Sequence, residues 1–252
     1  MIGIFDSGIG GATIFKEILK LVPNYHYFYY SDSINNPYGD KSPDEIYEIV
    51  KNVVVFLIDK GCSIIVIACN TASTICVKKL REEFSSITFI ATEPAYKMVF
   101  DYAIDGKTIV MATKGTIESE RFNFLYHTYD NGKTFLLMCP GLADLIEQNK
   151  KNDVKVYLKN LFKDFIDIEN VVLGCTHYPL IKKEIKDVLG EVRFFDSGRG
   201  VSMELKRQIE KKGLKKTKKE IEFFDSSSNS LKKERFYKII GENILENNST
   251  SN

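Results

Sequence analysis

The sequence predicts an α/β protein made of two similar, doubly wound parallel-sheet domains related by pseudo-twofold symmetry. Three observations support this prediction. Short apolar runs rich in Ile, Val and Phe alternate with stretches of helical spacing, the two halves of the chain repeat one order of motifs, and polar residues follow the apolar runs. Runs this uniformly apolar are typical of parallel strands covered by helices on both faces.

Five apolar runs are predicted to be strands, in the order Ile2–Phe5, Ile64–Ala68, Ile87–Ala91, Ile109–Met111 and Val171–Leu173. Between them, segments such as Asp44–Lys60 carry apolar residues every three or four positions, which is typical of a helix packed on a sheet. This alternation of strand and helix predicts crossover connections between parallel strands.

The last fifth of the chain differs in composition. The charge-rich stretch Ile209–Glu222 predicts a solvated helix and connector. A strand-like piece ending in a polar turn, Phe223–Ser230, and a helical piece, Leu231–Ile240, follow it. The tail Glu246–Asn252 is predicted to be disordered.

A weak internal repeat relates the two halves. Asp6, in GIFDSGIGG, precedes Cys69, in IVIACNTAS, by 63 positions, and Thr113, in IVMATKGT, precedes Cys175, in VVLGCTHYP, by 62. In each half a strand, a polar turn, helices and a further strand lead to a small residue and a cysteine. The repeat predicts two similarly wound units that meet near Pro94, where the pattern breaks.

Composition limits the partners and the compartment. The chain carries 35 basic and 34 acidic residues, so it lacks the positive field that recruits nucleic acid or anionic lipid. We expect a small-molecule partner, no nucleic acid and no membrane. No apolar run approaches the ~18 residues that span a bilayer, and no basic segment precedes an apolar one at the start, so we expect a cytoplasmic protein. Five cysteines without short paired spacings predict reduced thiols.

Four polar turns, DSGIGG, ACNTAS, ATKGT and GCTHYP, are expected at the carboxyl ends of strands, where open parallel sheets bind ligands. Helix N-termini at such turns present unpaired N–H groups and partial positive charge, which stabilise carboxylates and thiolates. We therefore expect a stabilised thiolate at Cys69 and Cys175. Cys62, Cys76 and Cys139 are expected to be buried core residues.

No cofactor or metal site is predicted. The cysteine and histidine spacings match no structural zinc site. Gly8–Gly11 lacks the spacing of a dinucleotide loop, because Thr13 stands where the last glycine would be, and no lysine context argues for a pyridoxal Schiff base. The glycines are instead expected to let the backbone approach a small ligand closely.

Two thiols in matching places suit proton exchange at a stereocentre. One thiolate would remove the α-proton from one face of the substrate while the other thiol supplies a proton to the opposite face. Asp6 could tune Cys69, and His177 could tune Cys175. Two other readings remain open at this point: a thiol hydrolase that uses Cys175 with His177, and a non-catalytic amino-acid-binding module.

The motifs GIFDSGIGG, NNPYGDKS, IVIACNTAS, ATKGTIES, CPGLADLIE and LGCTHYPL, in this order between Ile2 and about Gly200, closely resemble those of bacterial glutamate racemases, in the aspartate/glutamate racemase superfamily. The resemblance implies cofactor-independent conversion of L-glutamate to D-glutamate for peptidoglycan, in a cleft between two α/β domains. It also implies a first domain of residues 1–95 and 208–252, a second of residues 96–207, and a homodimer.

The resemblance also implies the roles of the site residues. Cys69 and Cys175 would be the catalytic thiols, with Asp6 assisting near Cys69, and His177 and Glu147 assisting near Cys175. The positions that match the family's substrate contacts are Asp6, Ser7, Tyr38, Gly39, Asn70, Thr71, Thr113, Thr116, Thr176 and His177.

Two places depart from the family pattern. Asn35 and Asn36 precede PYG where basic or apolar residues are usual, and Asp144 stands where an apolar residue or proline is usual. The first departure bears on loop contacts. The second bears on Glu147, which could instead be a plain surface glutamate on a helix. Sister enzymes of the same fold, an aspartate or hydantoin racemase, a maleate isomerase or a decarboxylase, are alternatives that a substrate panel would separate.

Overall fold

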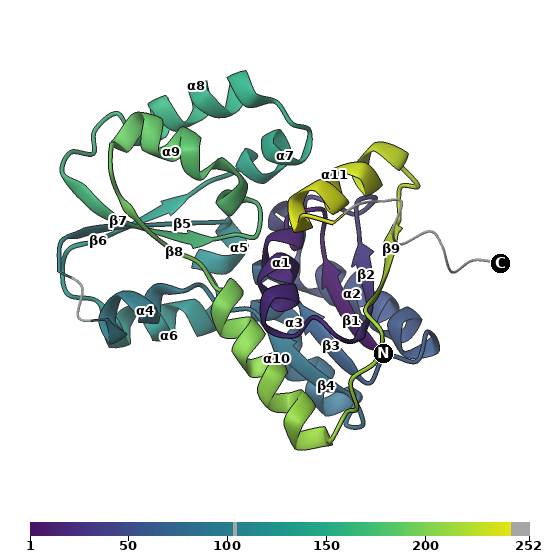
Figure 1. Cartoon of the computed structure of the whole chain (residues 1–252). Coiled ribbons are helices and arrows are strands. Elements are labelled where there is room, and N and C mark those ends of the chain that lie inside the picture. The colour runs from purple at the N-terminus through teal and green to yellow at the C-terminus, as the bar shows by residue number, and fades with distance from the viewer. Residues whose placement is uncertain (103–104, 243–252) are drawn as a thin grey trace.

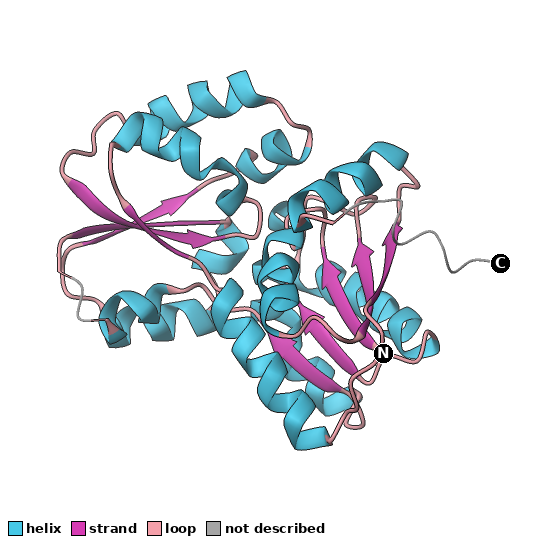
Figure 2. Ribbon diagram, in the orientation of Figure 1, coloured by secondary structure: helices cyan, strands magenta, loops and turns pink. Residues whose placement is uncertain are grey.

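The computed structural model describes residues 1–102 and 105–242, and its strands form two separate parallel sheets (Figures 1 and 2). The predicted disordered tail, Glu246–Asn252, lies outside the described residues. Within the described ranges, no helix has both the length and the apolar character needed to cross a membrane.

The first unit contains the strands β1 (Ile2–Asp6), β2 (His26–Ser31), β3 (Ile64–Ile67), β4 (Thr88–Ala91) and β9 (Glu220–Asp225). Its helices are α1 (Ala12–Leu21), the 3-10 turn η1 (Tyr38–Asp40), α2 (Pro43–Asp59), α3 (Asn70–Glu83), α10 (Gly198–Lys212) and α11 (Ser230–Ile240).

The second unit contains the strands β5 (Lys107–Ala112), β6 (Thr134–Met138), β7 (Ile168–Gly174) and β8 (Arg193–Phe195). Its helices are α4 (Tyr96–Asp101), α5 (Lys114–Ile117), α6 (Glu120–Tyr129), α7 (Leu142–Glu147), α8 (Lys151–Phe162), the 3-10 turn η2 (Tyr178–Ile181) and α9 (Lys182–Leu189).

Both sheets have the same winding. The first has the strand order β4-β3-β1-β2-β9, and the second, given in the matching direction, has β8-β7-β5-β6. Each unit therefore places its first and third strands in the centre of its sheet, and β9 extends the first sheet beyond β2. This common order agrees with the repeat predicted from the sequence. It also places the four predicted polar turns at the carboxyl ends of the central strands β1, β3, β5 and β7.

Local sequence explains why α2 begins where it does. The Ser42 side chain accepts a hydrogen bond from the Glu45 backbone, the Glu45 side chain accepts one from the Ser42 backbone, and Pro43 fills the first helical position. The buried residues Ile46, Tyr47, Val50, Val53, Val54 and Leu57 then face the sheet. The predicted helix Asp44–Lys60 is confirmed to within one residue at each end.

Three strands were not predicted: β2, β6 and β8. The strand β2 reads HYFYYS, so its core residues are aromatic instead of Ile or Val. Tyr27 and Tyr29 are fully buried because their hydroxyls donate to the carbonyls of Val22 and Gly8. The strand β8 has three residues, which is too short to show a periodicity.

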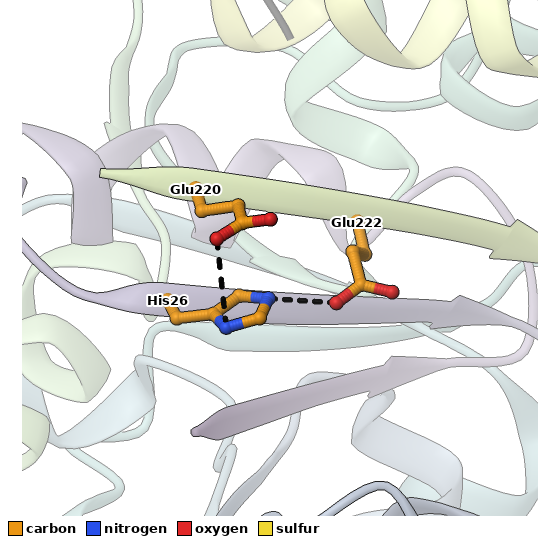
Figure 3. A group of neighbouring side chains, drawn as sticks. All are labelled: His26, Glu220 and Glu222. Atoms are coloured by element: carbon orange, nitrogen blue, oxygen red, sulfur yellow. Dashed lines mark hydrogen bonds and ion pairs between the residues drawn. The ribbon is translucent and has the colours of Figure 1, made fainter. Parts of the chain in front are cut away.

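The end of the charged stretch forms the edge strand β9, which pairs in parallel with β2. Beside this pair, His26 lies between two carboxylates: its Nε2 is 2.7 Å from Glu222 and its Nδ1 is 3.8 Å from Glu220 (Figure 3). Each carboxylate faces a different ring nitrogen, whereas a metal ion would need both on the side of one nitrogen. The cluster therefore fits polar contacts that fasten β9 to β2.

The helices α10 and α11 pack on the first unit. The helix α10 lies against α1 and β4, and α11 lies against α1 and β9. The division of the chain into residues 1–95 with 208–252, and residues 96–207, remains a proposal. Since residue 208 lies within α10, we propose to move that boundary to about Gly198, where α10 begins.

Candidate active site

Both predicted thiols line one narrow cavity between the units, with a volume of about 90 Å³. The predicted site residues that line it are Ser7, Tyr38, Gly39, Cys69, Asn70, Thr71, Thr113, Cys175, Thr176 and His177. Asp6, Glu147 and Thr116 lie behind this lining, in contact with Thr176, His177 and Thr113 respectively. A larger cavity, of about 440 Å³, reaches Cys175 but includes neither Cys69 nor His177.

Cys69 follows β3 and precedes the first residue of α3. Its Sγ lies 3.5 Å from Ser7 Oγ. Burial raises the pKa of the Cys69 thiol to about 12, and the charge of Asp6 adds to this, while hydrogen bonds from Ser7 and the Ala72 backbone lower the pKa by less. The stabilised thiolate that the helix N-terminus predicted for Cys69 is therefore wrong in this structure, because desolvation outweighs the helix end.

Cys175 has an imidazole partner. Its Sγ lies 3.8 Å from His177 Nδ1, and His177 Nε2 lies 2.6 Å from Glu147 Oε2. Burial lowers the pKa of His177, but hydrogen bonds and charge interactions with Cys175 and Glu147 raise it well above its ordinary value. Burial raises the pKa of Glu147, but His177 and Lys232 outweigh it, so that this pKa is about 2. At neutral pH the pair is an imidazolium and a carboxylate.

Glu147 is not a surface glutamate. It ends α7, and its side chain is only 6% exposed. Its Oε2 also accepts a hydrogen bond from the Ile9 backbone, at 3.1 Å, so the carboxylate contacts the first unit as well as His177. The departure at Asp144 raised the alternative that Glu147 lies on the surface, and its burial rules that alternative out.

Asp6 joins the two units. Its Oδ2 accepts hydrogen bonds from the Gly8 and Gly11 backbone, at 3.2 and 2.9 Å, and its Oδ1 accepts one from Thr176, at 3.2 Å. Complete burial raises the pKa of Asp6 to about 6, although the positive charge of His177 lowers it. Asp6 thus acts on Cys69 through its charge, and the Ser7 hydroxyl makes the direct contact with the sulfur.

Two of the loop glycines lie close against side chains of the second unit. A Cβ at Gly8 would lie 2.8 Å from Glu147 Oε2, and one at Gly10 would lie 2.5 Å from His177 Nδ1 and 2.6 Å from Thr176 Oγ1. These distances are shorter than any real contact of a Cβ atom. Gly8 and Gly10 therefore make room for side chains of the second unit, and the expected close approach of this backbone to a ligand stays a prediction.

Hydroxyl groups from both units meet at one side of the cavity. Thr113 Oγ1 lies 2.9 Å from Thr71 Oγ1 and 3.0 Å from Thr116 Oγ1. Tyr38 donates to Asp32, at 2.6 Å. Asn70 lines the cavity, and its buried Oδ1 has no hydrogen-bond partner among the described residues.

Several residues near the site were not predicted. Asn36 Nδ2 donates to Asp144 Oδ1, at 3.0 Å, so the two departures from the family pattern contact each other beside the cavity. Lys232 contacts Glu147 from α11, although its sequence, LKKERFYKII, resembles any solvated helix. Cys62, Cys76 and Cys139 are buried, as predicted, but Cys139 also lines the cavity.

Comparison with known proteins agrees with this geometry. Residues 2–200 match the family described as Asp/Glu/Hydantoin racemase. A glutamate racemase from Clostridium perfringens is 41% identical over 234 residues, which cover 89% of this chain and 90% of that one. A glutamate racemase isoform from Bacillus anthracis has a TM-score of 0.84, 31% identity, and coverage of 97% and 95%. The Francisella tularensis glutamate racemase in complex with D-glutamate has a TM-score of 0.82, 30% identity, and coverage of 95% and 93%.

Proposed function

The chain belongs to the Asp/Glu/Hydantoin racemase family and interconverts L- and D-glutamate, and we propose that it does so by a two-base mechanism with the thiols Cys69 and Cys175. The observation that carries this proposal is the narrow cavity lined by both thiols. Each thiol follows the third strand of its unit, β3 or β7, so the two sheets bring equivalent groups to one substrate from different directions.

The proton transfers follow from this arrangement. In the direction from L to D, the Cys175 thiolate takes the α-proton, and the electron pair of the broken C–H bond passes to the carbon and its carboxylate. The Cys69 thiol then donates its proton to the opposite face, which leaves Cys69 as a thiolate. In the direction from D to L the two roles exchange. The family pattern supplies this assignment of faces.

The neighbours of the thiols prepare them for opposite roles. His177, whose pKa is raised well above its ordinary value, places a positive charge 3.8 Å from the Cys175 sulfur. Burial and the charge of Asp6 keep Cys69 in its thiol form at neutral pH. General acid–base catalysis by two groups requires one base and one acid at the start, and for the L-to-D direction we assign the base to Cys175 and the acid to Cys69.

The cavity also contains polar groups that can stabilise the negative charge that develops on the substrate and can bind its ammonium group. Removal of the α-proton beside a carboxylate builds negative charge, which positioned donors stabilise most when water is excluded. We propose that the hydroxyls of Ser7, Thr71, Thr113 and Thr176 supply such donors. The unpartnered Oδ1 of Asn70 would accept a hydrogen bond from the substrate ammonium group.

We assign the activity to the supply of D-glutamate for peptidoglycan in the cytoplasm. Five free cysteines are compatible with that reducing compartment. Cells depleted of the protein should then need D-glutamate in the medium, and unimpaired growth without it would contradict this role. A homodimer remains our expectation for the assembly, which sedimentation equilibrium would test against a monomer.

Substitution of single thiols tests the mechanism. Cys69→Ala and Cys175→Ala should each reduce kcat for racemisation by a factor of at least about 10²–10⁴, because each removes one of two obligatory acid–base groups. Cys76→Ala is the matched control, since Cys76 lies on α3 in the core and not at the cavity. Racemisation by either active-site variant at the rate of this control would rule out the two-base mechanism. A thiol hydrolase would require Cys175 and dispense with Cys69.

A further inference from the structure

We propose that Lys232 and Arg235, on the C-terminal helix α11, position the Cys175 side of the active site from the opposite unit. They hold Glu147, and Glu147 in turn holds His177 toward Cys175. Figure 1 shows α11 lying beside α7, the short helix that ends at Glu147. This inference rests on the two-base mechanism proposed above.

Lys232 fixes one oxygen of the carboxylate. Its Nζ lies 2.8 Å from Glu147 Oε1, and the two side chains are only 19% and 6% exposed. In the described part of the chain, Oε1 has no other polar contact. The second oxygen, Oε2, faces His177 and the Ile9 backbone. The carboxylate is thus held from three elements, and Lys232 supplies a positive charge opposite the imidazolium.

Arg235 fixes the backbone of the same residue. Its two terminal nitrogens donate to the carbonyls of Glu147, at 2.6 Å, and Ile146, at 2.7 Å. Glu147 is the last residue of α7, and the Ile146 carbonyl also accepts from the Asn149 backbone, at 3.0 Å. The guanidinium adds a second donor to Ile146 and a donor to Glu147, and it opposes the negative end of the helix dipole. Arg235 therefore fixes the position of the Glu147 backbone, and Lys232 fixes the position of its carboxylate.

The contacts join different units. The helix α11 packs against α1 and β9 of the first unit, and Lys232 also donates to Ser33 in that unit, at 2.6 Å. Glu147 and His177 belong to the second unit. A carboxylate that accepts from one imidazole nitrogen fixes the orientation of the ring, and here it aims Nδ1 at the sulfur. Lys232 and Arg235 are positioning residues in this scheme, because they act on the sulfur through Glu147 and His177.

The test compares Lys232→Met with Lys233→Met, a matched control. Lys233 is the next residue on α11, and it has no ion pair among the described residues. We expect Lys232→Met to reduce kcat on the order of tenfold, the lower end of the scale for groups that orient metal-binding imidazoles, with a smaller change in KM. Lys233→Met should keep the original kcat, and Lys232→Arg should recover most of the loss because it restores the charge.

Isotope effects distinguish a loss of positioning at Cys175 from a general disturbance of the active site. Slower proton transfer at Cys175 alone should raise the α-deuterium isotope effect on kcat/KM for L-glutamate, whose proton Cys175 removes. It should lower the effect for D-glutamate, because removal by Cys69 then limits the rate less. A rise for D-glutamate alone would keep the positioning role and reverse the assignment of faces. Arg235→Lys should change the two isotope effects in the same pattern, since it loses the paired contact with two carbonyls.

Two results would overturn the inference: Lys232→Met with the kinetics of Lys233→Met, or isotope effects that move together for both enantiomers. If Lys232→Met does not fold, Lys232→Gln and Arg235→Lys provide the same comparison, with the thermal midpoint measured for each. The unsubstituted protein separates this question from the proposed function. Racemisation with a one-base isotope pattern in that protein would contradict the mechanism itself, independently of α11.

Discussion

Cys69 and Cys175 have equivalent places in their units but different neighbours. Cys69 lies near a carboxylate and a hydroxyl, whereas Cys175 lies beside an imidazolium. The difference follows from two residues: Asp6, at the end of β1, acts on Cys69 through its charge, and His177 follows Cys175 by two positions in the same turn. A symmetric fold therefore carries an asymmetric distribution of charge, which suits a pair that starts as acid and base.

Glu147 gives a pH-dependent prediction. Its pKa is about 2 in the folded protein and 4.5 ordinarily, so its ion pairs stabilise the protein above pH 4.5 and lose this contribution as the pH falls toward 2. The shift corresponds to a free energy on the order of 3 kcal/mol. Glu147→Gln should therefore lower the free energy of unfolding more at pH 6 than at pH 3.5, as measured by urea denaturation.

Glu234→Gln is the control for this measurement, because Glu234 is exposed on α11.

Asp6 affects the pH dependence of stability with the opposite sign: its pKa is raised, so its ionisation lowers the stability as the pH rises from 3.8 through about 6. Comparing each variant with the unsubstituted protein at the same pH removes this contribution. An equal loss at both pH values for Glu147→Gln would contradict the ion-pair assignment.

The placement of single residues at strand ends was predictable, because it follows from the order of apolar runs and polar residues along the sequence. Asp6 and Cys69 come directly after apolar runs, Cys175 and His177 follow the run Val171–Leu173 within four positions, and parallel strands bring such positions to one edge. The partner of Glu147 was not predictable in this way. Lys232 is one of several lysines on a charged helix, and only the folding of α11 against the first unit brings it to α7.

At the scale of elements, the loop between β1 and α1 is shaped by what packs against it. Gly8 and Gly10 leave space for Glu147 and for His177 with Thr176. The sequence showed that backbone approaches something closely here, but it did not show that the neighbour is the protein's own second unit. The same limit explains β2, whose tyrosines are buried because the fold supplies acceptors for their hydroxyls.

Gly10→Ala tests this packing. The added methyl would lie 2.5 Å from His177 Nδ1 and 2.6 Å from Thr176 Oγ1, so the loop or these two side chains must shift, which disturbs the contact between His177 and Cys175. A displacement of about 1 Å can cost on the order of 10² in rate, and we expect a loss of kcat on that scale. Gly200→Ala is the control, since a Cβ there meets nothing within 4 Å in α10. Unchanged kcat in Gly10→Ala would contradict the close packing of this loop on His177.

At the scale of the whole molecule, the site is assembled by contacts between the units. Thr176 reaches Asp6, Thr113 reaches Thr71, and Asn36 reaches Asp144. The repeat predicted two similar units, and the order of the sheets agrees with it. The pairing of side chains across the interface has no periodic signal in the sequence, because it depends on the relative placement of two folded units.

Early incorporation of deuterium tests the two-base mechanism most directly. The reduced, metal-free protein is incubated with L-glutamate in deuterated water, and the α-position of both enantiomers is followed by NMR after chiral separation. The two-base mechanism predicts that the first D-glutamate formed carries deuterium while the remaining L-glutamate keeps its proton, since different thiols serve the two faces. Deuterium that appears in L-glutamate as fast as in D-glutamate would contradict it, because one base would then serve both faces.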